Sequence, residues 1–293
     1  MTRFKNIPHI YYINSEDRID LKEYTESNLT DIGISNFTRV SNLKFHPEDF
    51  ANWKHLVYNE NRVTSEIIAE VSTSISYIHT IKKWLEDTNE KYMIIMSDHV
   101  DYSYVEFFHE DWDWNYFIEN IPHDCDSMLL GFEDKLNVLP CFLHPMRDSH
   151  GTGMTMLTRR YAEKLVKFHC LNEKYNFFQK ISNKFWKTDS GLVPLHYFMN
   201  QCGKSYAIPL FPRNPDLTED KYFTREIMQN NKKLYSAWWK ELKDMTGTEQ
   251  FHLYFSPKDF YLNLKHLTEK KISISETNIN HDVLIFQDHD RRI

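Results

Sequence analysis

A polar segment that follows an apolar run is the part of this sequence best suited to chemistry. The run YMIIM at positions 92–96 is followed by SDHVD at 97–101, so Asp98 and Asp101 lie three residues apart with His99 between them. A short apolar run is typical of a buried strand, and α/β folds bind ligands beyond the carboxyl ends of such strands. Two carboxylates there could hold Mg²⁺ or Mn²⁺ on a diphosphate. An acidic loop that caps the next helix explains the same spacing, so both interpretations stay open.

The sequence is poor in glycine, which restricts how it could bind phosphate. Only 7 of its 293 residues are glycine, and neither GxGxxG nor GxxxxGK[ST] occurs. Two of the seven are Gly151 and Gly153, beside His150. Glycine lets a backbone approach a ligand closely, although a plain turn explains the pair as well. A nucleotide would therefore be bound without a glycine fingerprint, and a divalent cation would take over the neutralisation of its phosphates.

The hydrophobic pattern supplies the elements that position these residues. It opens with a strand, a helix and a strand, and this order predicts an α/β fold with a mostly parallel sheet flanked by helices. We expect a main domain over 1–245 and a mixed, polar C-terminal appendage over 246–293. The expected strands are 9–13, 37–41, 92–96, 127–132, 152–157 and 206–210, and the expected helices are 19–32, 64–86, 159–168, 189–199 and 222–245.

Composition excludes several classes of protein. With 41% apolar and 15% aromatic residues the chain can build a core, which argues against disorder. Its net charge of −7 disfavours nucleic acid as a partner. Four cysteines without a CxxC pair predict reduced thiols and a cytoplasmic location. We expect neither a signal peptide nor a transmembrane segment, because no stretch approaches about 20 apolar residues.

Several blocks, in a fixed order over roughly residues 8–215, carry a resemblance to a known family. The sequence resembles glycosyltransferase family 25, which includes lipopolysaccharide-type glycosyltransferases, collagen galactosyltransferases and virus-encoded relatives. Each block is loose, and their order gives the resemblance its specificity. The blocks are IYYIN at 10–14 with Arg18 and Asp20, SYIHTIKKW at 76–84, MIIMSDHV at 93–100, GTGMTMLTRRYAEKL at 151–165, Thr188 with Asp189, and YAIPL at 206–210.

The resemblance implies a fold of the glycosyltransferase-A type and a reaction. The enzyme would transfer a hexose from a nucleotide diphosphate sugar, expected to be UDP-linked, to a hydroxyl of a saccharide or protein acceptor, with Mn²⁺ or Mg²⁺. The resemblance places the metal on Asp98, His99 and Asp101. It places the donor near Asn14, Ser15, Arg18, Gly151 and Gly153, and Asp189 near the acceptor as the general base. A helix N-cap explains Asp189 without any chemistry.

The sequence also departs from the family pattern where the metal would bind. Tyr77 replaces a histidine of the family block, and Ser97, Asp98 and His99 stand where relatives have Glu-Asp-Asp. His99 could ligate Mn²⁺ through a neutral imidazole. The alternative is a catalytically degenerate member that binds a glycan or a partner. A third hypothesis is a His-Asp metallohydrolase, based on the pairs at 123–124 and 281–282 and on the DHD segment at 288–290.

Overall fold

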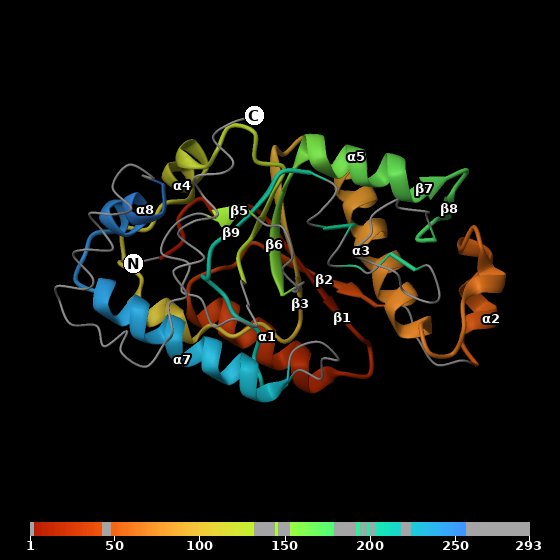
Figure 1. Cartoon of the computed structure of the whole chain (residues 1–293), viewed down its shortest axis with the longest axis horizontal. Coiled ribbons are helices and arrows are strands. Elements are labelled where there is room, and N and C mark those ends of the chain that lie inside the picture. Colours follow the sequence, from red (N-terminus) through yellow and green to blue (C-terminus); the bar gives the residue numbers. More distant parts are fainter. Residues whose placement is uncertain are drawn as a thin grey trace, which may run out of the picture.

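The chain forms a seven-stranded sheet with helices on both faces, in a computed structural model (Figure 1). The structure describes residues 3–42, 48–131, 144–145, 153–178, 192–193, 195, 198–199, 203–217 and 224–255. The sheet order is β2-β1-β3-β6-β4-β9-β5. Its strands are β1 (Ile10–Asn14), β2 (Phe37–Ser41), β3 (Tyr92–Ser97), β4 (Ser127–Leu129), β5 (His144–Pro145), β6 (Met154–Thr158) and β9 (Ser205–Ala207).

The strand directions confirm the predicted fold class. β2 and β3 both pair in parallel with β1, and β9 pairs in parallel with β4. β6 is antiparallel to both β3 and β4, and β5 is antiparallel to β9. Strands β2, β1, β3, β4 and β9 therefore run one way, and only β6 and β5 run the other way. The sheet is mostly parallel, as expected, with an antiparallel strand at its centre that the sequence pattern did not indicate.

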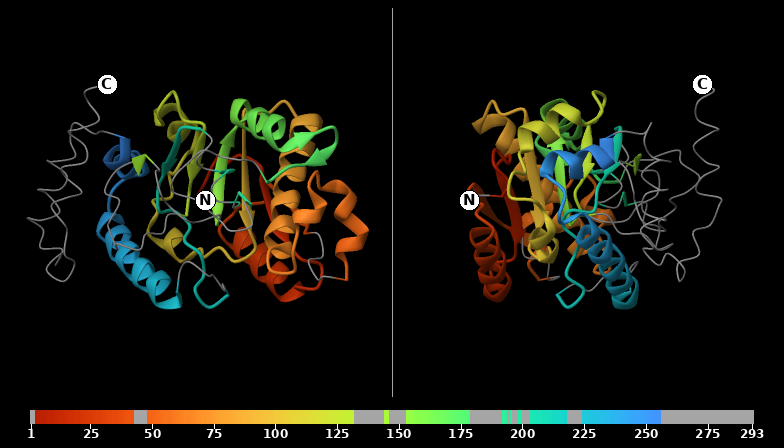
Figure 2. Two further views of the ribbon diagram at one scale, coloured as in Figure 1. Left: turned by 45° about the vertical axis from the view of Figure 1, so that its right-hand side comes forward. Right: turned by 90° about the vertical axis from the view of Figure 1, so that its left-hand side faces the viewer.

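Helices and short 3₁₀ turns complete the described chain. The α-helices are α1 (Ile19–Asp31), α2 (Phe50–Trp53), α3 (Ile68–Asp87), α4 (Trp114–Asn120), α5 (Arg159–His169), α7 (Arg225–Leu242) and α8 (Gly247–Phe255). The 3₁₀ turns are η1 (Lys54–Leu56), η2 (Glu60–Arg62) and η3 (Ser103–Phe107), and β7 (Cys170–Leu171) pairs with β8 (Lys174–Tyr175) as a hairpin. Figures 1 and 2 show α7 and α8 at one end of the molecule, and α2 with this hairpin at the other. None of the described helices is long and apolar enough to cross a membrane.

Alternation along the strands builds a core on each face of the sheet. Tyr12 and Met96 lie in the core that includes Leu29 of α1, whereas Ile13 and Ile95 lie in the core that includes α3 and α5. Successive strand side chains point to opposite faces. Helices α1 and α3 therefore cover opposite faces of the first three strands.

Side-chain caps fix where two of the predicted helices begin. The Thr158 hydroxyl accepts a hydrogen bond from the Tyr161 amide at the start of α5, and Thr224 caps the Ile227 amide at the start of α7. Threonine is a favoured N-cap because its hydroxyl satisfies an amide that the helix leaves free. Helix α1 ends just before Gly33, whose φ of 84° suits glycine.

The start of the expected C-terminal appendage packs into the main core. Gln250 of α8 is fully buried, and Phe251 lies 3.9 Å from Trp112, measured between ring centroids. Trp112, Trp114 and Phe117 are likewise buried in this core. Residues 256–293 lie outside the described residues, so the boundary at 245–246 stays a prediction.

We predict that Gly131→Ala destabilises the fold, because this glycine has backbone directly above it. A Cβ there would lie 2.3 Å from the Phe211 carbonyl oxygen. Two chain segments must then move apart, and we expect about 2–3 kcal/mol of lost unfolding free energy. Urea unfolding followed by tryptophan fluorescence measures it. Gly153→Ala is the matched control, since its Cβ would meet only the Arg213 side chain, at 3.1 Å. Equal losses for the two variants would contradict the prediction.

Candidate functional site

The carboxyl ends of β1 and β3 form the topological switch point of the sheet. From β1 the chain continues to β2 on one side of this strand pair, and from β3 it continues to β4 on the other side. Open α/β sheets bind ligands in the crevice beyond the carboxyl ends of such a pair. Asn14 ends β1 and Asp98 directly follows β3. The fold thus brings two predicted site residues, 84 positions apart in the sequence, to the edge where a ligand is expected.

Asn14 and Asp98 are joined directly. The Asn14 side-chain amide donates to Asp98 Oδ2 at 2.7 Å and to the Arg18 carbonyl oxygen at 3.1 Å. Its own oxygen accepts from Arg39 Nε at 2.9 Å. Asn14 is buried, whereas the Asp98 side chain keeps 13% of its exposure. The carboxylate is therefore held from the protein side while part of it faces solvent.

His99 lies beside this carboxylate and links it, through Ser97, to Gly153 just before β6. Its Nδ1 is 3.2 Å from Asp98 Oδ1, and its Nε2 is 3.2 Å from the Ser97 hydroxyl. Ser97 in turn donates to the Gly153 carbonyl oxygen through its amide, at 2.9 Å, and its hydroxyl, at 3.3 Å. Asp98, His99 and Gly153 thus belong to one cluster, and the metal and donor roles expected for them stay predictions.

The described contacts of Asp101 are with residues outside this cluster. Its Oδ1 accepts from the Ser103 amide at 2.8 Å, and its Oδ2 pairs with Lys232 of α7. The side chain is almost fully buried, at 6% exposure. A role as a metal ligand stays a prediction, and it would require this ion pair to open.

A buried tyrosine and a buried arginine complete the electrostatics of the cluster. Tyr77, which replaces the family histidine, is buried on α3. Burial raises the pKa of its phenol, the negative charge of Asp98 raises it further, and Arg213 opposes this rise. Burial likewise raises the pKa of Tyr102, with smaller contributions from Tyr24, Tyr12, Asp98 and Asp101. Both phenols consequently remain protonated at neutral pH beside the Asp98 carboxylate.

The Arg213 side chain packs against Gly153. Its backbone bridges to Val100, and its side-chain stem lies where a Cβ at position 153 would be, 3.1 Å from Cγ. The close approach that the sequence suggested at this glycine is therefore made by Arg213.

The other predicted residues are placed less tightly or fall outside the described chain. Ser15 contacts the neighbouring Asp17, and its carbonyl oxygen accepts from Arg39 at 3.2 Å. Arg18 is half-exposed and pairs with Asp20, at 3.3 Å from Nε to Oδ1. Two further predicted residues, Gly151 and Asp189, lie outside the described residues, as does His150 beside Gly151.

Sequence reasoning missed Arg39 and Arg213. Arg39 is the central residue of the predicted strand FTRVS, and its register partner Tyr12 lies two residues before Asn14. That position on β2 was a usable signal, because residues two apart on a strand share a face. Arg213 lies in a proline-rich exit from the last strand, which gave no periodic pattern to follow.

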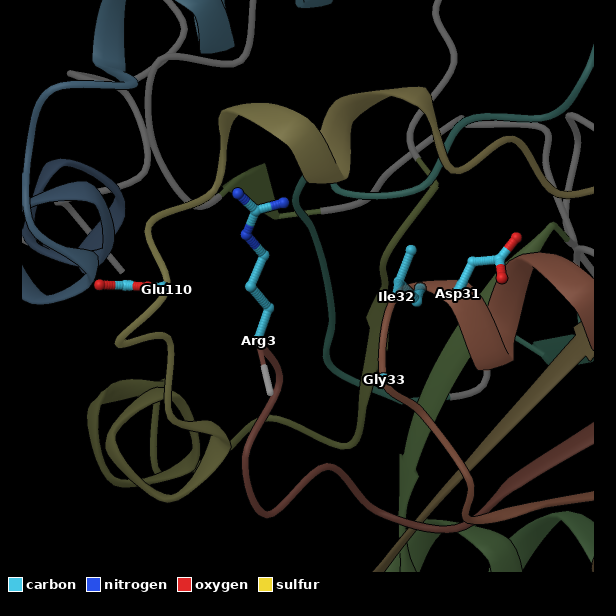
Figure 3. Close-up of a pocket in the computed structure, with 5 residues that line it drawn as sticks. All are labelled: Arg3, Asp31, Ile32, Gly33 and Glu110. Carbon is cyan, nitrogen blue, oxygen red and sulfur yellow. The ribbon is translucent and has the colours of Figure 1, made fainter. Parts of the chain in front are cut away.

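A separate pocket of about 360 Å³ lies at the end of α1, away from this cluster. Figure 3 shows Arg3 between Glu110 and the residues that end α1. Because α1 runs back from the carboxyl end of β1 to the start of β2, this pocket lies toward the amino ends of the parallel strands. Ligands of α/β sheets bind at the other edge, so the pocket is not our candidate site.

The comparisons with known proteins find only weak structural similarity. The chain resembles A197 from STIV at 13% identity and a TM-score of 0.35, over 70% of this chain and 83% of that chain. It resembles the inositol-1-phosphate CTP transferase from T. maritima at 11% identity and a TM-score of 0.33, over 78% and 98% of the two chains. For HddC from Yersinia pseudotuberculosis, complexed with GMP-PN, the values are 10%, 0.34, 79% and 100%. No family model and no curated protein matches the sequence. At these TM-scores the similarities assign no function to this chain.

Proposed function

We propose that this protein is a transferase that binds a nucleotide diphosphate sugar at the carboxyl ends of β1 and β3 and passes its hexose to a hydroxyl acceptor. The observation that carries the proposal is the Asn14–Asp98 contact at the switch point, where a carboxylate that keeps part of its exposure is held by a buried amide. The resemblance to glycosyltransferase family 25 supports it, because Asn14 and Asp98 lie in two of the blocks that carry that resemblance. A UDP-linked donor is the first candidate.

The described residues suit a metal that the substrate itself helps to bind. Among them, no three His, Cys, Asp or Glu side chains gather in a way that could hold a cation. Mg²⁺ sites commonly use one or two carboxylates together with substrate phosphates and water. Asp98 supplies a carboxylate, and His99 supplies an imidazole that suits Mn²⁺ better than Mg²⁺. When bound, such a cation would neutralise the charge of the departing diphosphate.

The remaining roles belong to side chains of this chain. Asn14 fixes the Asp98 carboxylate, and the segment from Ser15 to Arg18 would contact the nucleotide. Tyr77 and Tyr102 stay protonated, because burial raises the pKa of both phenols. Asp189 is proposed as the general base that takes the proton from the attacking hydroxyl.

Donor hydrolysis and calorimetry test the proposal. Purified protein with Mn²⁺ is incubated with UDP-, GDP- and CMP-sugars, and release of the nucleoside phosphate is followed. We expect turnover and binding with one nucleotide class, with UDP first. If no nucleotide sugar gives turnover and none gives a thermal shift, the enzyme hypothesis is refuted.

A second candidate is a catalytically degenerate relative that binds a glycan or a partner. The Lys232 ion pair on Asp101 favours it, because this carboxylate is committed within the protein. Glycan binding that does not depend on a metal, without affinity for UDP, would support this candidate over the enzyme.

A further inference from the structure

Arg39, on the edge strand β2, contacts the cluster and is not among the residues proposed to touch the donor. Arg39 lies on β2, in register with Tyr12 of β1. Tyr12 and Met96 lie in the core on the α1 face, and Asn14 and Asp98 follow them by two residues. Because strand side chains alternate, these positions share that face. Arg39 can therefore reach the end of β1 from the neighbouring strand.

The Asn14 amide has a bonding partner for every polar atom. Its NH₂ group donates to Asp98 Oδ2 and to the Arg18 carbonyl oxygen, and its oxygen accepts from Arg39 Nε. An amide turned by half a rotation would set its oxygen against a carboxylate and a carbonyl, and its NH₂ group against a guanidinium. Buried polar groups left without partners are costly, so the orientation is determined by Arg39 as well as by Asp98.

Arg39 also holds the segment that follows β1. Its second nitrogen donates to the Ser15 carbonyl oxygen at 3.2 Å. The same guanidinium therefore fixes the Asn14 side chain and the backbone that follows it, and its charge acts on Tyr12 and Glu26 beside it. A fork of N–H donors suits this double task, whereas lysine carries its donors at a single point.

We infer that Arg39 is a positioning residue, which orients the Asp98 carboxylate through the Asn14 amide for the phosphate-bearing ligand. Its importance for ligand binding rests on the proposed function, whereas its effect on Asn14 does not. Removing the donor would free the amide to rotate, and Asp98 would lose its fixed partner. The hydrogen bonds involved are charge-assisted, so we expect a loss of affinity on the order of tenfold.

Side-chain amide exchange and ligand affinity test the inference in parallel. Arg39→Leu removes all donors, and Arg39→Gln keeps a shorter side chain with an NH₂ donor group. Hydrogen exchange of the Asn14 NH₂ group is followed by NMR on ¹⁵N-asparagine-labelled protein, with Asn14→Asp to assign the signal. UDP affinity with Mn²⁺ is measured by calorimetry. Arg160→Leu is the matched control, since Arg160 forms an exposed pair with Asp126 away from the site.

We expect fast exchange and about tenfold weaker UDP binding in Arg39→Leu, with both effects smaller in Arg39→Gln and absent in Arg160→Leu. Unchanged exchange in Arg39→Leu would overturn the inference. Fast exchange with unchanged affinity would also overturn it, because Arg39 would then be purely structural. If the wild type binds no UDP, the proposed function fails, and the amide exchange still decides whether Arg39 orients Asn14.

Discussion

Asp98→Asn is expected to lower kcat/KM for the nucleotide-sugar donor at least about a hundredfold, a loss of about 2.7 kcal/mol of transition-state stabilisation. The substitution keeps size and shape, and the new amide oxygen can still accept from Asn14, which now lies 2.7 Å away. What disappears is the negative charge that would hold a cation on the diphosphate. Since the fold stays intact, the loss reports on that charge. Steady-state kinetics with the donor found in the nucleotide screen measures it.

The matched control for this prediction is Asp31→Asn. Asp31 is exposed at the end of α1 and lines the pocket at the opposite edge of the sheet. This variant should keep full activity and the same affinity for UDP in the presence of Mn²⁺. Activity of Asp98→Asn within threefold of the wild type would remove the carboxylate from the mechanism, and the degenerate-relative hypothesis would gain.

The parts of the fold that follow from local periodicity could be predicted from the sequence. The pattern of Ile19 to Ile32 predicts a helix that stops near Gly33, and α1 does end at Asp31. The apolar run at 92–96 predicts β3, and the acidic residue after it lies at the carboxyl edge as expected. Both signals are short-range, because helix and strand periods are read within one segment.

The antiparallel direction of β6 could not be predicted in this way. Its sequence, MTMLT, has the same apolar character as a parallel central strand. Strand direction depends on how the chain returns to the sheet, and residues 132–143 and 146–152, before β6, carry no periodic signal that would fix this return. The pairing of Met96 with Met154 brings Ser97 to Gly153, which is a consequence of the sheet order and not of either segment.

Part of the candidate site could be predicted from the sequence, and the part that depends on long-range contacts could not. Asn14, Asp98 and Gly153 meet because strand ends gather at one edge. The spacing in the sequence could not show that Asp98 and Asp101 make different contacts. Beyond the end of a strand, the strand period no longer fixes the direction of a side chain. In the fold, Lys232 arrives from α7, 131 positions further along the chain, and pairs with Asp101. Such a long-range partner leaves no trace in a local motif.

Gln250→Leu is expected to destabilise the whole domain by about 3 kcal/mol, because each buried polar group left without a partner costs about 1–3 kcal/mol. Gln250 is fully buried on α8. Its amide donates to the carbonyl oxygens of Phe107, at 3.0 Å, and Leu242, at 2.8 Å, and its oxygen accepts from the Trp112 indole at 2.6 Å. Leucine fills a similar volume and satisfies none of them. Urea unfolding followed by tryptophan fluorescence measures the loss.

This variant also decides where the domain ends. If α8 belongs to the cooperative unit, Gln250→Leu lowers the midpoint of global unfolding, because Trp112 stacks on Phe108 and makes a tilted contact with Phe251 inside the main core. If the boundary lies at 245–246, the midpoint stays unchanged and only limited proteolysis near residue 246 becomes faster. Gln229→Leu, on the exposed side of α7, should do neither. A lowered midpoint would place α8 in the main domain, since its contacts run to η3 and α7, and α7 in turn supplies the Lys232 partner of Asp101.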